Sequence, residues 1–294
     1  MTLASFRTGL ASGFAGLALA ALVSAGAFAA EGGEGGTPHY PIKHPKHVDW
    51  TFSGPLGHYD IGQLQRGLKV YKEVCSACHS LKYVAFRNLE ELGYSEEQVK
   101  AFASEYTVTD GPNGDGEMFE RPGTPSDRFP SPFPNEEAAA AANSGAAPPD
   151  LSLIAKARAP ERGFPTFVLD IFTQYAEGGP DYIYSLLTGY SDAPHGVEIA
   201  DTAHYNPYFI AGSSLAMASP LSDGVVTYDD GKPETVDQYA KDVAAFTMWA
   251  AEPHLAARKA MGFKVMIYLV ILAGLLYLVR KAVWADVKRK PQAA

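Results

Sequence analysis

The segment Val74-Cys75-Ser76-Ala77-Cys78-His79 contains both cysteines of the 294-residue chain, and a histidine follows the second cysteine directly. This C-x-x-C-H spacing is the pattern of covalent haem attachment. Two thiols on one helical turn can add to the two vinyl groups of a haem, and the adjoining imidazole can then ligate the iron from the proximal side. The motif therefore predicts Cys75 and Cys78 as attachment residues of one haem c and His79 as an iron ligand.

Three other uses of the cysteine pair are a thioredoxin-like redox pair, half of a zinc site and a local disulfide. A redox pair normally follows a strand, whereas Leu64, Leu68 and Tyr71 lead into this motif with helical spacing. A closed zinc site needs four ligands, and the fourth would have to come from a scattered histidine. Haem attachment is therefore the favoured interpretation.

The second axial ligand decides whether the iron transfers electrons or keeps an open position for a small molecule. Met217 lies in a small-residue, proline-ended stretch at 211–221, which would let the backbone approach a flat cofactor. Met118 lacks that setting, and Met248 falls in an amphipathic stretch where core packing is expected. Met217 is the preferred candidate from spacing, although a loop methionine can equally well fill a hydrophobic gap. The weaker candidates are the other histidines: His39, His44, His47, His58, His195, His204 and His254.

An apolar segment lies near each end of the chain. Residues 1–29 contain Arg7 as their single charge and end in Ala27-Phe28-Ala29, which is typical of a secretory signal peptide. Met261 to Val279 contains 19 residues with Lys264 as the single charge, which is long enough for one membrane helix. Because basic residues follow this second segment, the positive-inside rule predicts a cytoplasmic C-terminus.

These signals divide the chain into four predicted parts. They are a signal peptide at 1–29, an exported c-type haem domain at 30–257, a transmembrane anchor at 258–282 and a basic cytoplasmic tail at 283–294. A secretory signal and a cytoplasmic tail agree with each other, because both place the large middle part on the exported side of the membrane.

The formal net charge of −9 is distributed unevenly. The part from Arg258 onward contains eight basic residues and one acidic residue, and Arg7 is a further basic residue. The predicted exported part keeps 15 basic and 32 acidic residues, or about −17. A domain this acidic is expected to repel nucleic acid and to attract a basic partner, although acidity also simply keeps a domain soluble.

The remaining pattern predicts helices joined by long loops. Residues 31–57 are expected to form an extended arm and residues 111–135 a loop without regular structure. Helices are expected from near Ile61 into the haem motif and at 89–105, 136–142, 151–158, 181–187 and 236–252. The sequence contains no phosphate-cradling glycine loop and no Ser/His/Asp set with a supporting signature, so it predicts no catalytic site of its own.

Beyond the haem motif, nearly all of the mature sequence resembles the cytochrome c1 family. The segments that carry the likeness include Arg66-Gly67-Leu68, Tyr83-Val84-Ala85, Asp110-Gly111-Pro112-Asn113, Arg121-Pro122-Gly123, Ala147-Pro148-Pro149-Asp150-Leu151-Ser152, Tyr205-Asn206-Pro207-Tyr208-Phe209 and Trp249-Ala250-Ala251-Glu252-Pro253. The resemblance implies a mostly α fold, a cytochrome c-like haem domain with long loops plus one C-terminal transmembrane helix.

The resemblance also implies a function. It indicates the haem c subunit of a bacterial-type cytochrome bc1 complex, a ubiquinol:cytochrome c oxidoreductase, which passes single electrons from the Rieske iron–sulfur protein to a cytochrome c. Cytochrome b and the lipid bilayer would be further partners. Cys75 and Cys78 match the thioether positions of the family, His79 the proximal ligand and Met217 the distal ligand. Arg158 matches an arginine expected near a haem propionate.

The chain departs from the family pattern in two places. Residues 164–180 resemble an inserted element relative to mitochondrial members, and the extra cysteine pair of some relatives is missing. The signal peptide indicates a bacterial inner membrane with the haem domain on the periplasmic side. The alternatives are a free-standing membrane-anchored c-type cytochrome, and a haem-based sensor or peroxidase with an open iron position.

Overall fold

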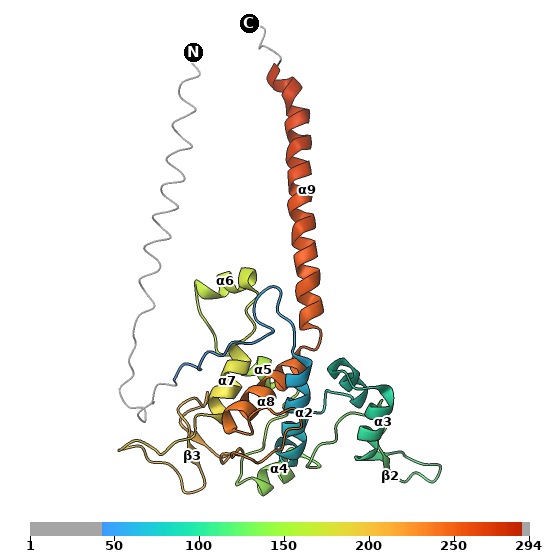
Figure 1. Cartoon of the computed structure of the whole chain (residues 1–294), viewed down its shortest axis with the longest axis vertical. Helices are drawn as coiled ribbons and strands as arrows, with labels where there is room; N and C mark the ends of the chain where they lie inside the picture. The colour runs from blue at the N-terminus through green and yellow to red at the C-terminus, as the bar shows by residue number, and fades with distance from the viewer. Residues whose placement is uncertain (1–42, 290–294) are drawn as a thin grey trace. The chain divides into compact units, whose positions relative to one another are not determined.

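The computed structural model describes residues 43–289, which belong to one unit, Tyr40–Ala294. The predicted signal peptide, His39, part of the predicted arm and the last five residues lie outside the described residues. Helices joined by long loops make up most of the described chain, which confirms the predicted mostly α fold (Figure 1). In chain order the elements are α2 (Ile61–Glu73), the 3-10 helices η2 (Cys75–Ala77) and η3 (Phe86–Leu92), α3 (Glu96–Ser104), β1 (Thr107–Asp110), β2 (Phe119–Pro122), α4 (Glu136–Ala142), α5 (Ile154–Ala157), α6 (Thr166–Thr173), α7 (Gly178–Leu187), β3 (His204–Tyr205), β4 (Ser214–Leu215), α8 (Val236–Ala251) and α9 (Leu255–Arg289).

The core of the domain forms where α2 packs against α8. The two backbones approach closely at Gly67, where an added Cβ atom would lie 2.2 Å from the Asp242 carbonyl oxygen and 2.6 Å from the Phe246 Cβ atom. One turn later, the rings of Tyr71 and Phe246 lie with their centroids 5.8 Å apart. Only glycine fits between these helices at position 67, so this residue sets the distance between the two main core helices.

A buried ion pair lies beside this close approach. Arg66 Nε donates to Asp242 Oδ2 at 2.9 Å, and Arg66 Nη1 donates to Asp230 Oδ2 at 2.6 Å. The Asp242 carboxylate also accepts hydrogen bonds from the Tyr228 hydroxyl and from Gln238 Nε2, both at 2.9 Å. Asp242 is fully buried, and both of its oxygens are bonded, which is the condition under which a buried charge is tolerated.

Several predicted helices are confirmed with clear start signals. Helix α2 begins at Ile61 because the side chain of Asp60 accepts a hydrogen bond from Gln63 N, and α4 begins at Glu136 because Asn135 caps Ala138 N in the same way. Helix α8 covers the predicted 236–252 stretch to within one residue. These caps are local, so sequence alone placed them well.

The single helix predicted at 89–105 is wrong, because the structure divides this stretch into η3 and α3. Gly93 ends η3 with a positive φ of 85°, a left-handed conformation that glycine adopts without steric cost. Ser95 then starts α3 with a capping box, in which Ser95 and Gln98 satisfy each other's backbone N–H groups.

The predicted irregular stretch at 111–135 is wrong in part, because β2 lies within it. Strands β1 and β2 form an antiparallel hairpin with Thr107 opposite Pro122 and Asp110 opposite Phe119. Arg121 on β2 pairs with both Asp110 and Asp127, which ties the hairpin to the following loop. Two further helices differ from prediction in their bounds. Helix α5 covers only part of the predicted 151–158, and α7 begins three residues before the predicted Asp181.

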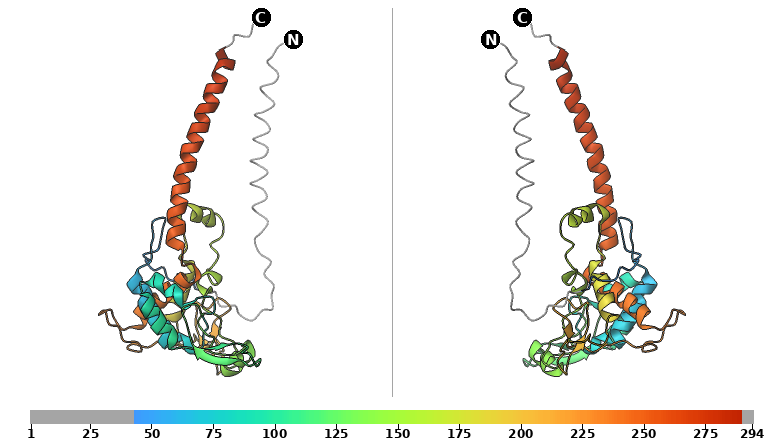
Figure 2. Two further views of the ribbon diagram at one scale, coloured as in Figure 1. Left: turned by 90° about the vertical axis from the view of Figure 1, so that its right-hand side faces the viewer. Right: turned by 90° about the vertical axis from the view of Figure 1, so that its left-hand side faces the viewer.

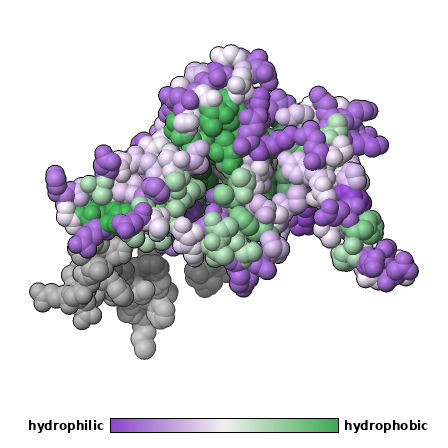
Figure 3. All heavy atoms as spheres, turned by 90° about the horizontal axis from the view of Figure 1, so that it is seen from below, coloured by the Kyte–Doolittle hydropathy of each residue, from purple (hydrophilic) through white to green (hydrophobic). Residues whose placement is uncertain are grey.

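The last described element is α9, which is one unbroken helix in both views of Figure 2. Its Leu255–Ala285 part is long and apolar enough to cross a membrane, and it contains the predicted span at Met261–Val279. Outside α9, the face of the domain drawn in Figure 3 is mostly hydrophilic, with apolar residues in small patches. The structure thus separates a globular part from a membrane-compatible helix.

Candidate functional site

The haem-attachment motif forms a tight turn at the end of α2. The Cys75 carbonyl oxygen accepts hydrogen bonds from Cys78 N at 3.1 Å and from His79 N at 2.9 Å. Both cysteines are free thiols; Cys75 is partly buried and Cys78 is exposed. Burial, reinforced by the nearby Cys78, raises the pKa of Cys75 to about 12, so this group is a protonated thiol near neutral pH.

The imidazole of His79 is held by a residue 70 positions away. Its Nδ1 lies 2.8 Å from the Pro149 carbonyl oxygen, and the Tyr71 hydroxyl donates to the His79 carbonyl oxygen at 3.1 Å. Burial lowers the pKa of His79, against the opposing effects of the Pro149 hydrogen bond and the Asp150 charge. In a neutral imidazole whose Nδ1–H donates to a carbonyl, the lone pair is on Nε2, which is the form that binds a metal.

Asp150 joins the residues after the motif to the 148–152 segment. Its Oδ2 accepts hydrogen bonds from Ser80 Oγ at 2.7 Å and from Lys82 N at 2.9 Å, and its Oδ1 accepts one from Ser152 N at 2.9 Å. Burial alone would raise the pKa of Asp150, but the hydrogen bonds from Ser152, Lys82 and Ser80 outweigh it and lower the pKa below its ordinary value.

The clamp around Asp150 is a feature that sequence reasoning missed. The Asp150 carboxylate holds two chain segments together that are far apart in the sequence. Tyr83 N also donates to Ser152 Oγ, and Leu151 N donates to Ser80 O at 2.8 Å. The only available signal was the Pro-Pro-Asp sequence itself, which does not reveal a partner 70 residues away.

Met217 follows β4 in the long segment that leads to α8, and it is partly buried. Its carbonyl oxygen accepts a hydrogen bond from the Tyr190 hydroxyl at 3.1 Å, which ties this loop to the residues after α7. Met248, in contrast, is buried within α8, as expected for core packing, and Met118 is exposed in the β1–β2 hairpin. The burial of the three side chains agrees with the sequence preference for Met217, whose role as a ligand stays a prediction.

Arg158 is the residue that follows α5, and its side chain is exposed. Within residues 43–289, no carboxylate lies within ion-pair distance of its guanidinium, whereas Lys156 on the same helix pairs with Glu252 at 2.7 Å. An arginine without a protein carboxylate is available to a propionate, so the predicted role of Arg158 is compatible with this geometry and stays a prediction.

The donors at the motif fit a haem c. The chain has no third cysteine that could pair with Cys75 or Cys78, and the hydrogen bond at Nδ1 leaves His79 with Nε2 as its metal-binding atom. The described part of the chain contains no cluster of three or more His, Cys, Asp or Glu side chains that could hold a metal ion. The roles of Cys75, Cys78 and His79 toward that haem stay predictions.

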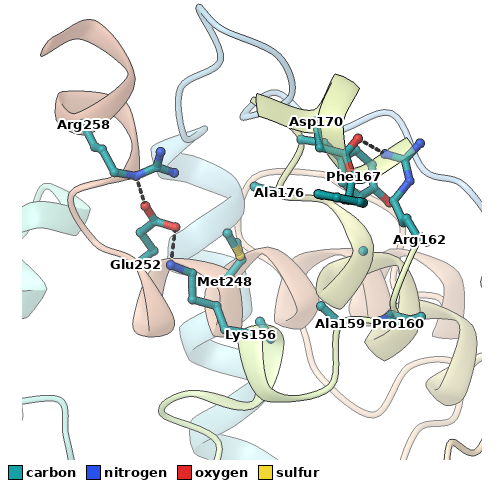
Figure 4. Close-up of a pocket in the computed structure, with 13 residues that line it drawn as sticks. Lys156, Ala159, Pro160, Arg162, Phe167, Asp170, Ala176, Met248, Glu252 and Arg258 are labelled. Carbon is teal, nitrogen blue, oxygen red and sulfur yellow. Dashed lines mark hydrogen bonds and ion pairs between the residues drawn. The ribbon is translucent and has the colours of Figure 1, made fainter. Parts of the chain in front are cut away.

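A cavity of about 390 Å³ lies elsewhere, between α5, α6, α8 and the start of α9 (Figure 4). None of the five predicted site residues lines it. The segment at 164–180 lines part of this cavity, and no residue of the haem motif lines it.

Comparison with known proteins places the chain in one family. The model of the Cytochrome C1 family matches residues 50–287. The chain is 57% identical over 270 residues to the cytochrome b/c1 of Bradyrhizobium diazoefficiens, a match that covers 90% of this chain and 39% of that longer protein. It is 46% identical over 284 residues to the cytochrome c1 of Rhodospirillum rubrum, covering 91% of this chain and 97% of that protein. The cytochrome c1 of Blastochloris viridis is 45% identical over 279 residues, with coverage of 94% and 96%. A family match that runs through the haem turn, the Asp150 clamp and the apolar C-terminal helix shows that this chain belongs to the cytochrome c1 family.

Proposed function

We propose that this chain is the electron-transfer subunit of a cytochrome bc1 complex, a membrane-anchored relay for single electrons without a substrate-converting site of its own. The observation that carries the proposal is the turn at 75–79, where two free thiols and an imidazole with its Nδ1 already bonded are available for one haem c. Haem c, the cofactor of this family, supplies a reversible one-electron change at its iron when bound.

Each predicted site residue has a distinct role in this proposal. Cys75 and Cys78 would hold the cofactor through thioethers, and His79 would bind its iron through Nε2. Met217 would offer its sulfur as a further iron ligand, and a methionine ligand raises the reduction potential of a haem. Arg158 pairs with a propionate, where a guanidinium stabilises a partly buried carboxylate.

The proposed partners follow from the family and from the charge. Cytochrome b and the Rieske iron–sulfur subunit would be neighbours in the complex, and the name cytochrome b/c1 of the Bradyrhizobium relative supports the first of these. A basic cytochrome c would be the electron acceptor, because the acidic exported part attracts a positive partner and raises the encounter rate at low salt. The same acidity disfavours binding of nucleic acid.

The proposed topology uses the four predicted parts of the chain. A signal peptide at 1–29 is removed, the haem domain at 30–257 lies in the bacterial periplasm, and the anchor at 258–282 crosses the inner membrane once. The basic tail at 283–294 then lies in the cytoplasm. The apolar character of α9 and the relatives from bacteria support this arrangement.

The test is purification of the tagged chain in a mild detergent, with reduced-minus-oxidised spectra for the haem and mass spectrometry for the partners. Haem c together with haem b and an iron–sulfur subunit is the expected result. Haem c alone would instead indicate a free-standing anchored cytochrome.

A second measurement addresses the sixth iron position. Reduced protein with Met217 bound to the iron should resist carbon monoxide. Rapid carbon monoxide binding by the intact protein would contradict an electron relay and favour a haem-based sensor or peroxidase.

A further inference from the structure

The segment at 164–180 contains a short helix, α6, and apolar side chains in this helix and just before it are exposed to solvent. Four of them are strongly exposed: Phe164 at 82%, Phe167 at 54%, Leu169 at 58% and Phe172 at 69%. Large apolar groups gathered within nine residues are unusual on a water-facing surface, and such patches mark contacts with a membrane or a partner.

Polar groups in and beside this segment bond to one another, while Phe167 borders the cavity of Figure 4 and is still 54% exposed. Arg162 Nη1 lies 2.8 Å from Asp170 Oδ1, and Figure 4 shows the two side chains pointing toward each other. The Arg162 guanidinium also stacks on the Tyr175 ring at 3.9 Å from its centroid. These contacts hold α6 in a defined orientation, so the outward position of the phenylalanines is a property of the folded segment.

A hydrogen bond places the end of α6 at the start of the membrane helix. Arg258 Nη1, in the first turn of α9, donates to Oε1 of Gln174, the residue that follows α6, at 3.3 Å. Both views of Figure 2 draw α6 beside the lower end of α9. The apolar stretch begins at Met261, three residues after Arg258, which is about 4.5 Å along a helix axis.

Leu56 is a further exposed apolar residue, and its loop also lies beside the first turns of α9. Lys259 Nζ donates to the carbonyl oxygens of Phe52 and Gly54, at 2.6 and 2.7 Å. This places the loop at 52–57 against the first turn of α9, and Leu56 in that loop is 78% exposed. Two segments far apart in the sequence therefore present apolar side chains around the start of the same helix.

We propose that α6 and the loop at 52–57 lie in the headgroup layer of the bilayer, with Phe164, Phe167, Phe172 and Leu56 in contact with lipid. The polar layer on each side of the hydrocarbon core is about 5–8 Å thick, so Arg258, about 4.5 Å before Met261 along the helix axis, would lie within it. Aromatic side chains favour this layer, and interfacial helices bury their apolar face about 5–10 Å into it.

The lipid contact gives the domain a second attachment to the membrane surface besides α9. A single helix leaves a domain free to tilt about the point of entry, whereas apolar contacts beside that point restrict the tilt. The inference rests on membrane anchoring by α9 and not on haem chemistry, so its failure and the failure of the electron-relay proposal are separate results.

The test uses the full chain within its purified complex, reconstituted in lipid nanodiscs. Single cysteines replace Phe164, Phe167 or Phe172 and carry a nitroxide, and the native Cys75 and Cys78 do not react once they are bound to haem. Val225→Cys is the matched control, because Val225 is an exposed apolar residue in the loop before α8. Leu276→Cys reports the lipid environment of α9.

The readout is the ratio of two collision rates for each nitroxide: the rate with oxygen, which concentrates in lipid, and the rate with a nickel complex, which stays in water. The nitroxides at positions 164, 167 and 172 are expected to have an oxygen-to-nickel ratio several-fold above that of Val225→Cys and below that of Leu276→Cys. Ratios equal to the Val225 control would overturn the proposal. Shielding from both reagents would also overturn it, because it would show a protein subunit over α6.

A measurement on the unmodified complex avoids any effect of the substitutions on folding. A phospholipid with a photoactivatable group near its headgroup is irradiated in the nanodisc, and labelled peptides are identified by mass spectrometry. Label is expected on peptides that contain residues 164–172 and 52–57. Label confined to α9 would contradict the proposal.

Discussion

The imidazole Nδ1 of His79 lies 2.8 Å from the carbonyl oxygen of Pro149, although 70 residues separate the two in the chain. With His79 as the proposed iron ligand, this contact would make the 148–152 segment part of the haem site, because a hydrogen bond at Nδ1 leaves Nε2 free for the iron. The neighbouring Asp150 stabilises the same contact, because its carboxylate accepts hydrogen bonds from Ser80 and Lys82, which follow His79 in the chain.

Replacement of Asp150 by asparagine should destabilise the protein at neutral pH by about 1–3 kcal/mol, because Ser80 and Lys82 lose a charged acceptor. The folded-state pKa of Asp150 lies below its ordinary value of 3.8, so its contribution is complete above that pH and is lost as the pH falls through the folded-state pKa. Denaturant unfolding at a series of pH values measures the difference between wild type and variant.

Asp115→Asn is the control for this experiment, because Asp115 is exposed in the β1–β2 hairpin. The control should have little effect at any pH. A wild-type advantage over Asp150→Asn that persists unchanged at strongly acidic pH would show that the carboxylate charge does not stabilise the clamp.

Gly67→Ala should destabilise the domain by about 1–3 kcal/mol or more, because the added methyl group overlaps the Asp242 carbonyl oxygen and forces α2 and α8 apart. Gly62→Ala on the same helix is the matched control. Its added Cβ would meet the nearest atom, Asp60 Oδ1, at an ordinary 3.5 Å, so it should be neutral or stabilise by about 0.5–1 kcal/mol. Thermal unfolding followed by circular dichroism distinguishes the two, and equal effects would refute the close approach.

Asp242→Ala should cost about 3–5 kcal/mol, because it leaves the Arg66 guanidinium largely buried without its main partner. Lys241→Ala, which removes the exposed pair with Asp237, should cost at most about 0.5 kcal/mol. Urea unfolding of both variants measures the contrast. A small effect for Asp242→Ala would mean that Asp230 alone neutralises Arg66.

Met217→Leu should lower the reduction potential on the order of 0.1 V or more and should open the iron to carbon monoxide, since axial ligands move haem potentials over about 0.8 V. Met248→Leu is the control, because Met248 is buried in α8 and its replacement should change stability by less than about 1.5 kcal/mol. Redox titration and carbon monoxide difference spectra report the outcome. An unchanged potential in Met217→Leu would remove Met217 from the ligand set.

Arg158→Gln should lower the reduction potential, because a nearby positive charge disfavours the more positive ferric state. Lys156→Gln provides the comparison, since it removes the same charge two residues away, at a side chain that pairs with Glu252 and not with a propionate. The shift should be larger for Arg158→Gln and should shrink as salt is added. Equal shifts in the two variants would show that Arg158 has no specific contact with a propionate.

The agreement between sequence and structure follows the range of the interactions involved. The start of α2 at Ile61 and of α4 at Glu136 depends on caps within three residues, and both were predicted. The break at Gly93 was also a local signal, yet it was overlooked because apolar residues continue on both sides of it. Helix α6 was not predicted, because its exposed phenylalanines do not show the buried face of an ordinary helix.

The sequence by itself determined the haem-binding chemistry, the membrane helix and the family, because these depend on spacing within a few residues or on the length of an apolar run. Only the tertiary structure revealed the Pro149 contact, the Asp150 clamp, the need for glycine at position 67 and the place of α6 beside α9. Each of these features joins residues that are far apart in the chain, from about 70 positions for His79 and Pro149 to more than 170 for Gly67 and Asp242. Such pairs meet only after the chain has folded.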